Sequence, residues 1–220
     1  MKNLTIPKAA LFALLYIFII KCFEFLVSYV QIFFIWNYDS DLVHLISTSL
    51  GNGIVFSVTY YFLKKKKLIN SISFNQNQIK NSLIAILVSL LFLLALMLFN
   101  GIVLKIIPFS GIHFDHFLIM FDIIPGQLLL LISYELFFRC FIQKIIQVQY
   151  SKKTTIISVA FLYAFTSLNL LSFTSLFYIS YSFILTLFLG IISGLLYDKS
   201  KSILPSIIFI VFYYLFAITI

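Results

Sequence analysis

Seven long apolar segments dominate the sequence, and each approaches the length that an α-helix needs to cross a membrane. Crossing the hydrocarbon core takes about 20 mostly apolar residues. Of the 220 residues, 62% are hydrophobic and 10% are charged, whereas about a quarter of a soluble domain is charged. The sequence therefore predicts an all-α, polytopic integral membrane protein. The predicted spans are 9–36, 42–63, 82–104, 126–149, 154–172, 177–197 and 203–220.

Basic residues are distributed unevenly over the connections between these segments, which predicts an orientation. Lys and Arg concentrate in the cytoplasmic loops of membrane proteins. With the N-terminus inside, 12 of the 15 Lys and Arg residues fall on the cytoplasmic side. Seven crossings then predict a cytoplasmic N-terminus and an extracellular C-terminus. The cytoplasmic set consists of Lys2, Lys8, Lys64, Lys65, Lys66, Lys67, Lys80, Lys144, Lys152, Lys153, Lys199 and Lys201.

Composition also limits which binding partners and which source organism we expect. The formal charge of +8 is not gathered on a polar face, so we expect no nucleic-acid partner and predict the lipid bilayer as the environment. Cys22 and Cys140 lie in apolar segments, which indicates packed side chains rather than a disulfide framework. The abundance of Lys, Ile, Phe and Asn is typical of AT-rich bacterial genomes. We therefore expect the cell membrane of a Gram-positive bacterium.

Two pairs of opposite charges lie inside predicted spans, where ionisable residues are costly. Lys21 and Glu24 are three residues apart and form either an intrahelical ion pair or a contact with a partner or polar cavity. Glu135 and Arg139, in S-Y-E-L-F-F-R-C, are four residues apart and share one helix face. An Arg in the middle of a span is among the most expensive residues to bury. We therefore predict a functional role for the second pair.

Further polar residues are expected around Glu135 and Arg139. The candidates to complete the hydrogen bonding are Tyr134, Tyr163 and Asn169. We expect this polar centre to lie between the helices 126–149, 154–172 and 203–220.

Two other patterns have simpler interpretations. His113, Asp115 and His116 suggest a metal site in the outer loop, but a stable site needs three or four ligands. We interpret this loop as a solvated polar segment and expect no metal or cofactor. Gly190-x-x-x-Gly194, with Ser193 between them, is a small-residue face for close helix packing.

Three of these segments, taken in order, resemble the CPBP or Abi superfamily over roughly residues 117–217. They are Glu135-x-x-x-Arg139, F-L-Y-A-F-T-S-L-N at 161–169, and the run from F-L-G-I-I-S-G at 188 to L-P-S-I-I at 208. The superfamily includes type II CAAX prenyl proteases, bacteriocin-processing and bacteriocin-immunity proteins, and lysostaphin-resistance proteins. The resemblance implies a helical bundle in the membrane. The G-x-x-x-G-x-x-Y run followed by S-x-L-P-S is its most specific part.

The proteolytic members carry EExxxR, then FxxxH, then HxxxN, and their Glu and His residues activate a water molecule. Carried over to this chain, the first Glu falls on Tyr134, the second on Glu135 and the Arg on Arg139. The Phe of FxxxH matches Phe161, but its His position falls on Phe165.

The later motif is also altered, because its His falls near Ile210 and its Asn near Tyr214. Phe and Ile side chains cannot relay a proton or orient water, and residues 154–220 contain no His. The resemblance therefore implies a catalytically degenerate member of the superfamily.

Three functions remain open at this point. The first is a non-catalytic scaffold or regulator of a membrane-anchored protein, such as a cell-wall hydrolase, or a bacteriocin self-immunity protein. The second is an active intramembrane CAAX-type endopeptidase. The third is a transporter, although the sequence has no inverted repeat and no pair of broken helices. We expect two parts, the N-terminal spans with the outer loop at 1–116 and the CPBP-like part at 117–217.

Overall fold

The computed structural model describes residues 6–35, 40–65, 77–102, 128–166 and 176–217, and these residues are helical apart from short turns. No strand occurs among them. The helices are α1 (Ile6–Ile35), α2 (Ser40–Lys65), α3 (Gln78–Ile102), α6 (Lys152–Thr166), α7 (Leu176–Ser200) and α8 (Leu204–Ala217). A seventh helix, here called the central helix, covers residues 128–146. The expected all-helical fold is confirmed.

The central helix changes its winding where the charged motif lies. Residues 128–135 are α-helical, η2 (Leu136–Gln143) is a π-helix, and α5 (Lys144–Ile146) returns to α-helical winding. A π-helical segment is rare and is often found at functional sites. All eight residues of η2 are buried, so the wider turn lies inside the bundle.

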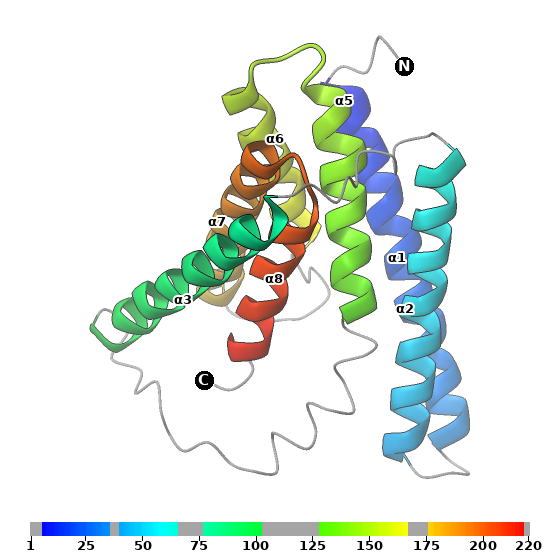
Figure 1. Ribbon diagram of the computed structural model, residues 1–220. Helices are drawn as coiled ribbons and strands as arrows, with labels where there is room; N and C mark the ends of the chain where they lie inside the picture. Colours follow the sequence, from blue (N-terminus) through cyan, green and yellow to red (C-terminus); the bar gives the residue numbers. More distant parts are fainter. Residues whose placement is uncertain (1–5, 36–39, 66–76, 103–127, 167–175, 218–220) are drawn as a thin grey trace.

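The helices pack in pairs around the central helix (Figure 1). α1 and α2 lie against each other on one side, and α2 also contacts η2. On the other side α6 packs along α7, and α3 packs along α8. α8 can begin at Leu204 and Pro205 because proline is tolerated in the first turn of a helix.

Two hydrophobic clusters form the core. The first joins α1, α2, the central helix and α6, with Phe138, Phe141 and Ile142 inaccessible or nearly so. Tyr16 of α1 stacks on Phe137 with ring centroids 3.8 Å apart. The second cluster joins α3, α7 and α8 around residues such as Phe209.

The outer faces of two helices are apolar, as a membrane environment requires. Gln78–Phe99 and Ile179–Ser200 are long and apolar enough to cross a bilayer, and only 17% and 33% of their most apolar windows are buried. Ile6–Tyr16 and Leu204–Leu215 are shorter apolar helices. An exposed apolar surface of this extent is unfavourable in water. Membrane insertion is therefore supported, while the predicted number of seven crossings stays a prediction.

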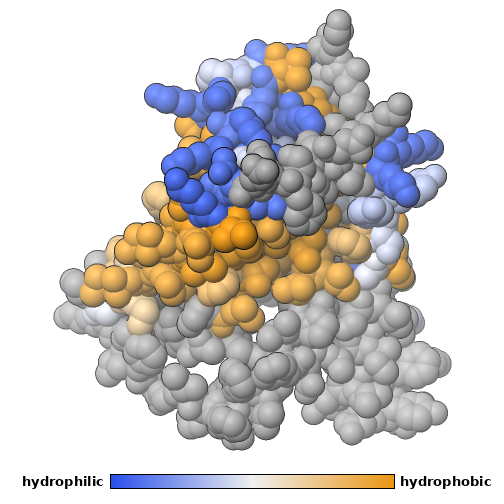
Figure 2. Space-filling model, in the orientation of Figure 1, coloured by the Kyte–Doolittle hydropathy of each residue, from blue (hydrophilic) through white to orange (hydrophobic). Residues whose placement is uncertain are grey.

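Hydrophilic residues gather at one end of the molecule, beyond an apolar band (Figure 2). The ends of helices that carry basic residues meet there: α2 ends on Lys64 and Lys65, α6 begins with Lys152 and Lys153, and α7 ends just after Lys199. Basic residues beside an apolar band are typical of the side of a membrane protein that faces the cytoplasm. We call this end of the molecule the basic end.

The helix boundaries differ from the predicted spans by a few residues. α3, for example, begins at Gln78, four residues before the predicted span 82–104. A side chain explains the early start: the Nε2 of Gln78 donates to the Oγ of Ser202 at 3.0 Å, and both residues are buried.

Candidate functional site

The motif residues form a row along the buried face of the central helix. Glu135, Arg139, Gln143 and Gln147 follow one another at four-residue spacing. In an α-helix four residues overshoot one turn, so such a row drifts around the axis. The wider π-helical winding of η2 includes Arg139 and Gln143. Both side chains donate to carbonyl oxygens of α7.

Glu135 and Arg139 form a buried ion pair. The Nε of Arg139 lies 3.3 Å from the Oε2 of Glu135, and both side chains are essentially inaccessible. The hydroxyl of Ser193, on α7, donates to the same Oε2 at 2.6 Å. This carboxylate oxygen thus accepts one hydrogen bond from its own helix and one from α7.

Arg139 is bound mainly by oxygen atoms of α7 and of its own helix. Its Nε also donates to the Oγ of Ser193 at 3.2 Å, and its second terminal nitrogen donates to the carbonyl oxygen of Gly190 at 3.0 Å. The remaining terminal nitrogen donates to the Oε1 of Gln143 at 3.2 Å. Each guanidinium nitrogen therefore has a protein acceptor, as a buried arginine requires.

The row continues from the interior to the basic end of the molecule. The Nε2 of Gln143 donates to the carbonyl oxygen of Gly194 at 3.2 Å, and the Nε2 of Gln147 donates to the Oδ1 of Asp198 at 3.3 Å. Lys201 donates to that Oδ1 at 2.5 Å, and Lys152 lies 3.6 Å from the Oδ2 of Asp198. We call this series of contacts between the central helix and α7 the polar ladder.

The two glycines of α7 make this close approach possible. A Cβ on Gly190 would lie 3.0 Å from the Cα of Ala160 on α6. A Cβ on Gly194 would lie 3.1 Å from Ile156 and 3.2 Å from a terminal nitrogen of Arg139. Both positions face crowded surroundings, and a role of the two glycines in helix packing stays a prediction.

Aromatic rings surround the ion pair on the side of α6. The guanidinium of Arg139 lies 5.5 Å from the ring centroid of the buried Tyr163, within the range of a cation–π contact. Tyr134 packs edge-on against Tyr163 with ring centroids 6.4 Å apart. The structure thus brings four predicted residues together: Tyr134, Glu135, Arg139 and Tyr163.

The positions that correspond to the family histidines have apolar surroundings. Phe165 is half exposed, and its ring packs on Phe183 with centroids 5.5 Å apart. Phe161 packs on the same ring at 5.8 Å. Ile210 is completely buried in the second core cluster, and Tyr214 packs against that cluster. None of these four side chains carries a group that could serve as a general base at neutral pH.

Sequence reasoning did not assign a role to Gln143, Gln147 or Asp198, and it did not include α7 among the helices around the polar centre. The missed signal was the regular spacing of four polar residues from Glu135 to Gln147. Ser193 was recognised only as a small residue, although its hydroxyl contacts both charged groups.

Some predicted residues lie outside the described part of the chain. They are Asn169, the loop residues His113, Asp115 and His116, and the side chains of Lys21 and Glu24. Among the residues that the structure does describe, no three His, Cys, Asp or Glu side chains gather to hold a metal ion.

One atom of the site lacks a partner among the described residues: the Oε1 of Glu135 is buried without a hydrogen bond. An unpaired carboxylate oxygen in the interior is costly. As a carboxylate oxygen without a hydrogen bond, it could accept a proton from a water molecule. Among the described residues around the Glu135–Arg139 pair, the site combines a hydrogen-bonded carboxylate and a guanidinium whose nitrogens all donate to protein oxygens, without a second carboxylate or imidazole next to them.

Comparison with known proteins gives one match. Residues 115–216 match the family described as type II CAAX prenyl endopeptidase Rce1-like. This match confirms the resemblance to the CPBP superfamily. No curated protein and no solved structure shows significant similarity to the chain.

Proposed function

Since residues 115–216 match the type II CAAX prenyl endopeptidase Rce1-like family, we propose that this CAAX-protease-like membrane protein acts without catalysis. It serves as a scaffold or regulator for a membrane-associated protein, such as a cell-wall hydrolase with a membrane anchor, or as a bacteriocin self-immunity protein. The supporting observation is the closed ion pair of Glu135 and Arg139, both completely buried, in a site without a second base.

Hydrolysis of a peptide bond needs a base, an oriented water molecule and a stabiliser for the oxyanion, all held near one reacting atom. Here Tyr134 and Phe165 occupy positions where the proteolytic members carry Glu and His, and a neutral phenol is a poor base. Arg139 could stabilise negative charge, but its nitrogens already donate to Glu135, Ser193, Gln143 and the carbonyl oxygen of Gly190. A substrate would have to displace α7 to reach the pair.

A second candidate function, intramembrane endopeptidase activity, is favoured by the unpartnered Oε1 of Glu135. If the bundle opens, this oxygen could take a proton from water while Arg139 faces the developing charge. The same geometry would then describe a resting state of the enzyme.

The proposed orientation has the N-terminus in the cytoplasm, seven crossings and the C-terminus outside, in the cell membrane of a Gram-positive bacterium. It is supported by the hydrophilic residues at one end of the molecule (Figure 2) and by the basic residues in the last turns of α2 and α7. In this orientation the polar ladder runs from the middle of the membrane to the cytoplasmic face.

Partner capture tests the scaffold proposal. The tagged wild type, Glu135→Gln and Gly190→Leu would each be purified from native membranes in mild detergent, and co-purifying proteins identified by mass spectrometry. Gly190→Leu crowds the backbone of Ala160 and should change the surface formed by α6 and α7. We expect one membrane-anchored protein to co-purify with the wild type and with Glu135→Gln, and to be lost with Gly190→Leu.

Folded yield by size-exclusion chromatography is the control for each variant. Gly53→Leu, in α2, is the matched substitution, because a Cβ at Gly53 meets no atom within 4 Å. A biological phenotype that disappears in a folded Glu135→Gln protein, with no partner captured by the wild type, would contradict the scaffold proposal and support the endopeptidase.

A further inference from the structure

The outer face of α3 is aliphatic and is not covered by any described helix. Leu83, Leu87 and Leu94 are 62%, 57% and 54% exposed, while the opposite face packs on α8. α3 is therefore attached to the bundle along one side and presents the other to the membrane.

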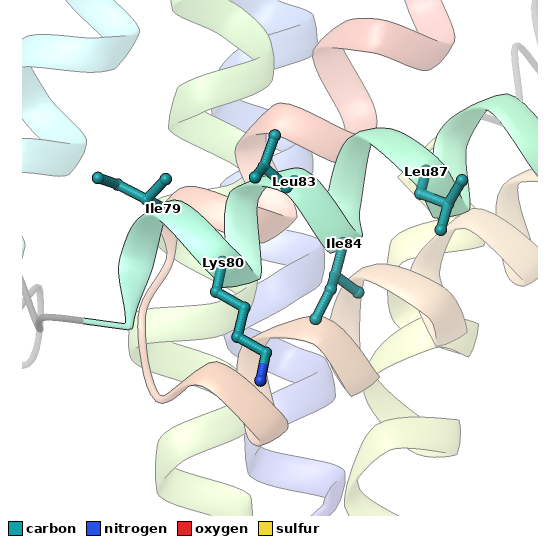
Figure 3. A pocket seen from close by; sticks show the side chains of 5 residues that line it. All are labelled: Ile79, Lys80, Leu83, Ile84 and Leu87. Atoms are coloured by element: carbon teal, nitrogen blue, oxygen red, sulfur yellow. The ribbon is translucent and has the colours of Figure 1, made fainter.

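A groove is present at the start of this face (Figure 3). It has a volume of about 490 Å³, and its described lining consists of Ile79, Lys80, Leu83, Ile84 and Leu87. Ile79 and Leu83 stand on one side of the helix axis, and Lys80, Ile84 and Leu87 stand on the other (Figure 3). Four aliphatic side chains thus border the groove, with one charge at its beginning.

Lys80 lies at the basic end of the molecule. The hydrogen bond from Gln78 to Ser202 fixes the start of α3 beside the turn between α7 and α8. The exposed Lys199 lies in the last turn of α7, and the exposed Lys201 lies in the turn that follows. Among the described carboxylates, none forms an ion pair with Lys80. The ammonium group of Lys80 is therefore available for an anion at the level of the lipid headgroups.

We propose that this groove binds an anionic phospholipid of the leaflet at the basic end, with its phosphate on Lys80 and one acyl chain along Ile84 and Leu87. From Ile79 to Leu87 the helix extends by about 12 Å, which corresponds to the upper part of an acyl chain. Charge complementarity favours an anionic headgroup, because basic residues near the membrane surface attract such lipids.

The lining residues favour a lipid over another helix as the occupant. Close helix packing in membranes relies on small residues such as Gly, Ala and Ser at the contact. The groove is bordered by Ile, Leu and Lys instead, so a second helix would be held at a distance. A flexible acyl chain can follow these branched side chains. This proposal is independent of whether the protein captures a partner or cleaves one.

Native mass spectrometry of the full-length protein in detergent tests the proposal. Phosphatidylglycerol and phosphatidylcholine with identical acyl chains would be titrated against the wild type, Lys80→Gln and Lys153→Gln. Lys153 is the matched control, since it is exposed at the start of α6, outside the groove. We expect the wild type to retain phosphatidylglycerol about five-fold more strongly than phosphatidylcholine. Lys80→Gln should lose this preference, and Lys153→Gln should keep it.

Two further measurements separate the alternatives. Leu87→Asn, which makes the groove polar, should weaken both lipids, and inorganic phosphate should not compete with either. An unchanged preference in Lys80→Gln, or an equal loss in Lys153→Gln, would overturn the proposal. So would a dimer of the wild type that Leu87→Asn dissociates, because a second copy of the chain would then be the occupant.

Discussion

Arg139 is held by one charged acceptor and three neutral ones, and this combination explains how it can lie inside the bundle. The carboxylate of Glu135 balances its charge, while Ser193, Gln143 and the carbonyl oxygen of Gly190 satisfy its other donors. Desolvation of an ion pair is expensive, so its contribution to stability is small compared with the cost of breaking it. Removal of one residue of the site should therefore leave a buried partner without its hydrogen bond or counter-charge.

The first prediction concerns the two charges. Arg139→Leu should leave a buried carboxylate supported only by Ser193, and should lower the free energy of unfolding by about 3–5 kcal/mol. Glu135→Met should have a similar cost. The double variant, which removes both charges, should be more stable than either single variant. Thermal unfolding in one detergent would compare the stabilities of the two single variants and the double variant. A double variant less stable than both single variants would show that the ion pair has a role beyond mutual compensation of charge.

The second prediction concerns Ser193. Its hydroxyl donates to the carboxylate of Glu135 at 2.6 Å, and a hydrogen bond to a charged group contributes about 1.5–3 kcal/mol. Ser193→Ala should lower the free energy of unfolding by about that amount. Ser57→Ala is the control, because the Ser57 hydroxyl is exposed and bonds only to the carbonyl oxygen of Gly53 within its own helix. Equal effects of the two substitutions would contradict the assigned role of Ser193.

At the scale of the elements, hydropathy predicted where the helices are, but not how they pair. Apolar runs of about 20 residues located the helices that the structure describes, most of them within a few residues. The sequence placed Glu135 and Arg139 on one face through their four-residue spacing. It did not reveal that this face meets α7, because helix pairing depends on contacts between residues more than 50 positions apart. The π-helix at Leu136–Gln143 was likewise not predicted, since the apolar pattern of the span does not distinguish it from an α-helix.

The third prediction concerns the contact between α6 and α7. Gly190→Ala places a methyl group 3.0 Å from the Cα of Ala160, where backbone must move. Overpacking of this kind costs about 1–3 kcal/mol. Gly53→Ala meets open space and should be neutral or stabilising by up to about 1 kcal/mol, because alanine favours the helix. Unfolding measurements of both variants under the same conditions would test this difference in stability. A Gly190→Ala protein more stable than the wild type would contradict the close packing of α6 and α7.

At the scale of the whole molecule, the hydrophilic end and the apolar band beside it (Figure 2) are the arrangement expected where a membrane protein leaves the bilayer. The two expected parts, 1–116 and 117–217, stay a prediction. Residues from both contribute to one core, in which Tyr16 stacks on Phe137. The first two helices therefore support the helix that carries Glu135 and Arg139.

The fourth prediction concerns orientation. A fluorescent protein that matures only in the cytoplasm, fused to the C-terminus, should stay dark, whereas alkaline phosphatase at the same position should be active. The physical reason is the concentration of basic residues on the cytoplasmic side. The same two reporters fused after Lys67, which we expect in the cytoplasm, provide the control. A fluorescent C-terminal fusion would contradict the seven-span orientation.

The most direct test of the central claim, that the site is closed and non-catalytic, is a survey of new peptide N-termini in native membranes. Membranes containing the wild type, Glu135→Gln, or a neutral Glu135→Gln/Arg139→Gln pair would be compared by mass spectrometry at equal amounts of folded protein. The account predicts the same set of N-termini in all three samples. A cleavage product present with the wild type and absent from both variants would contradict it.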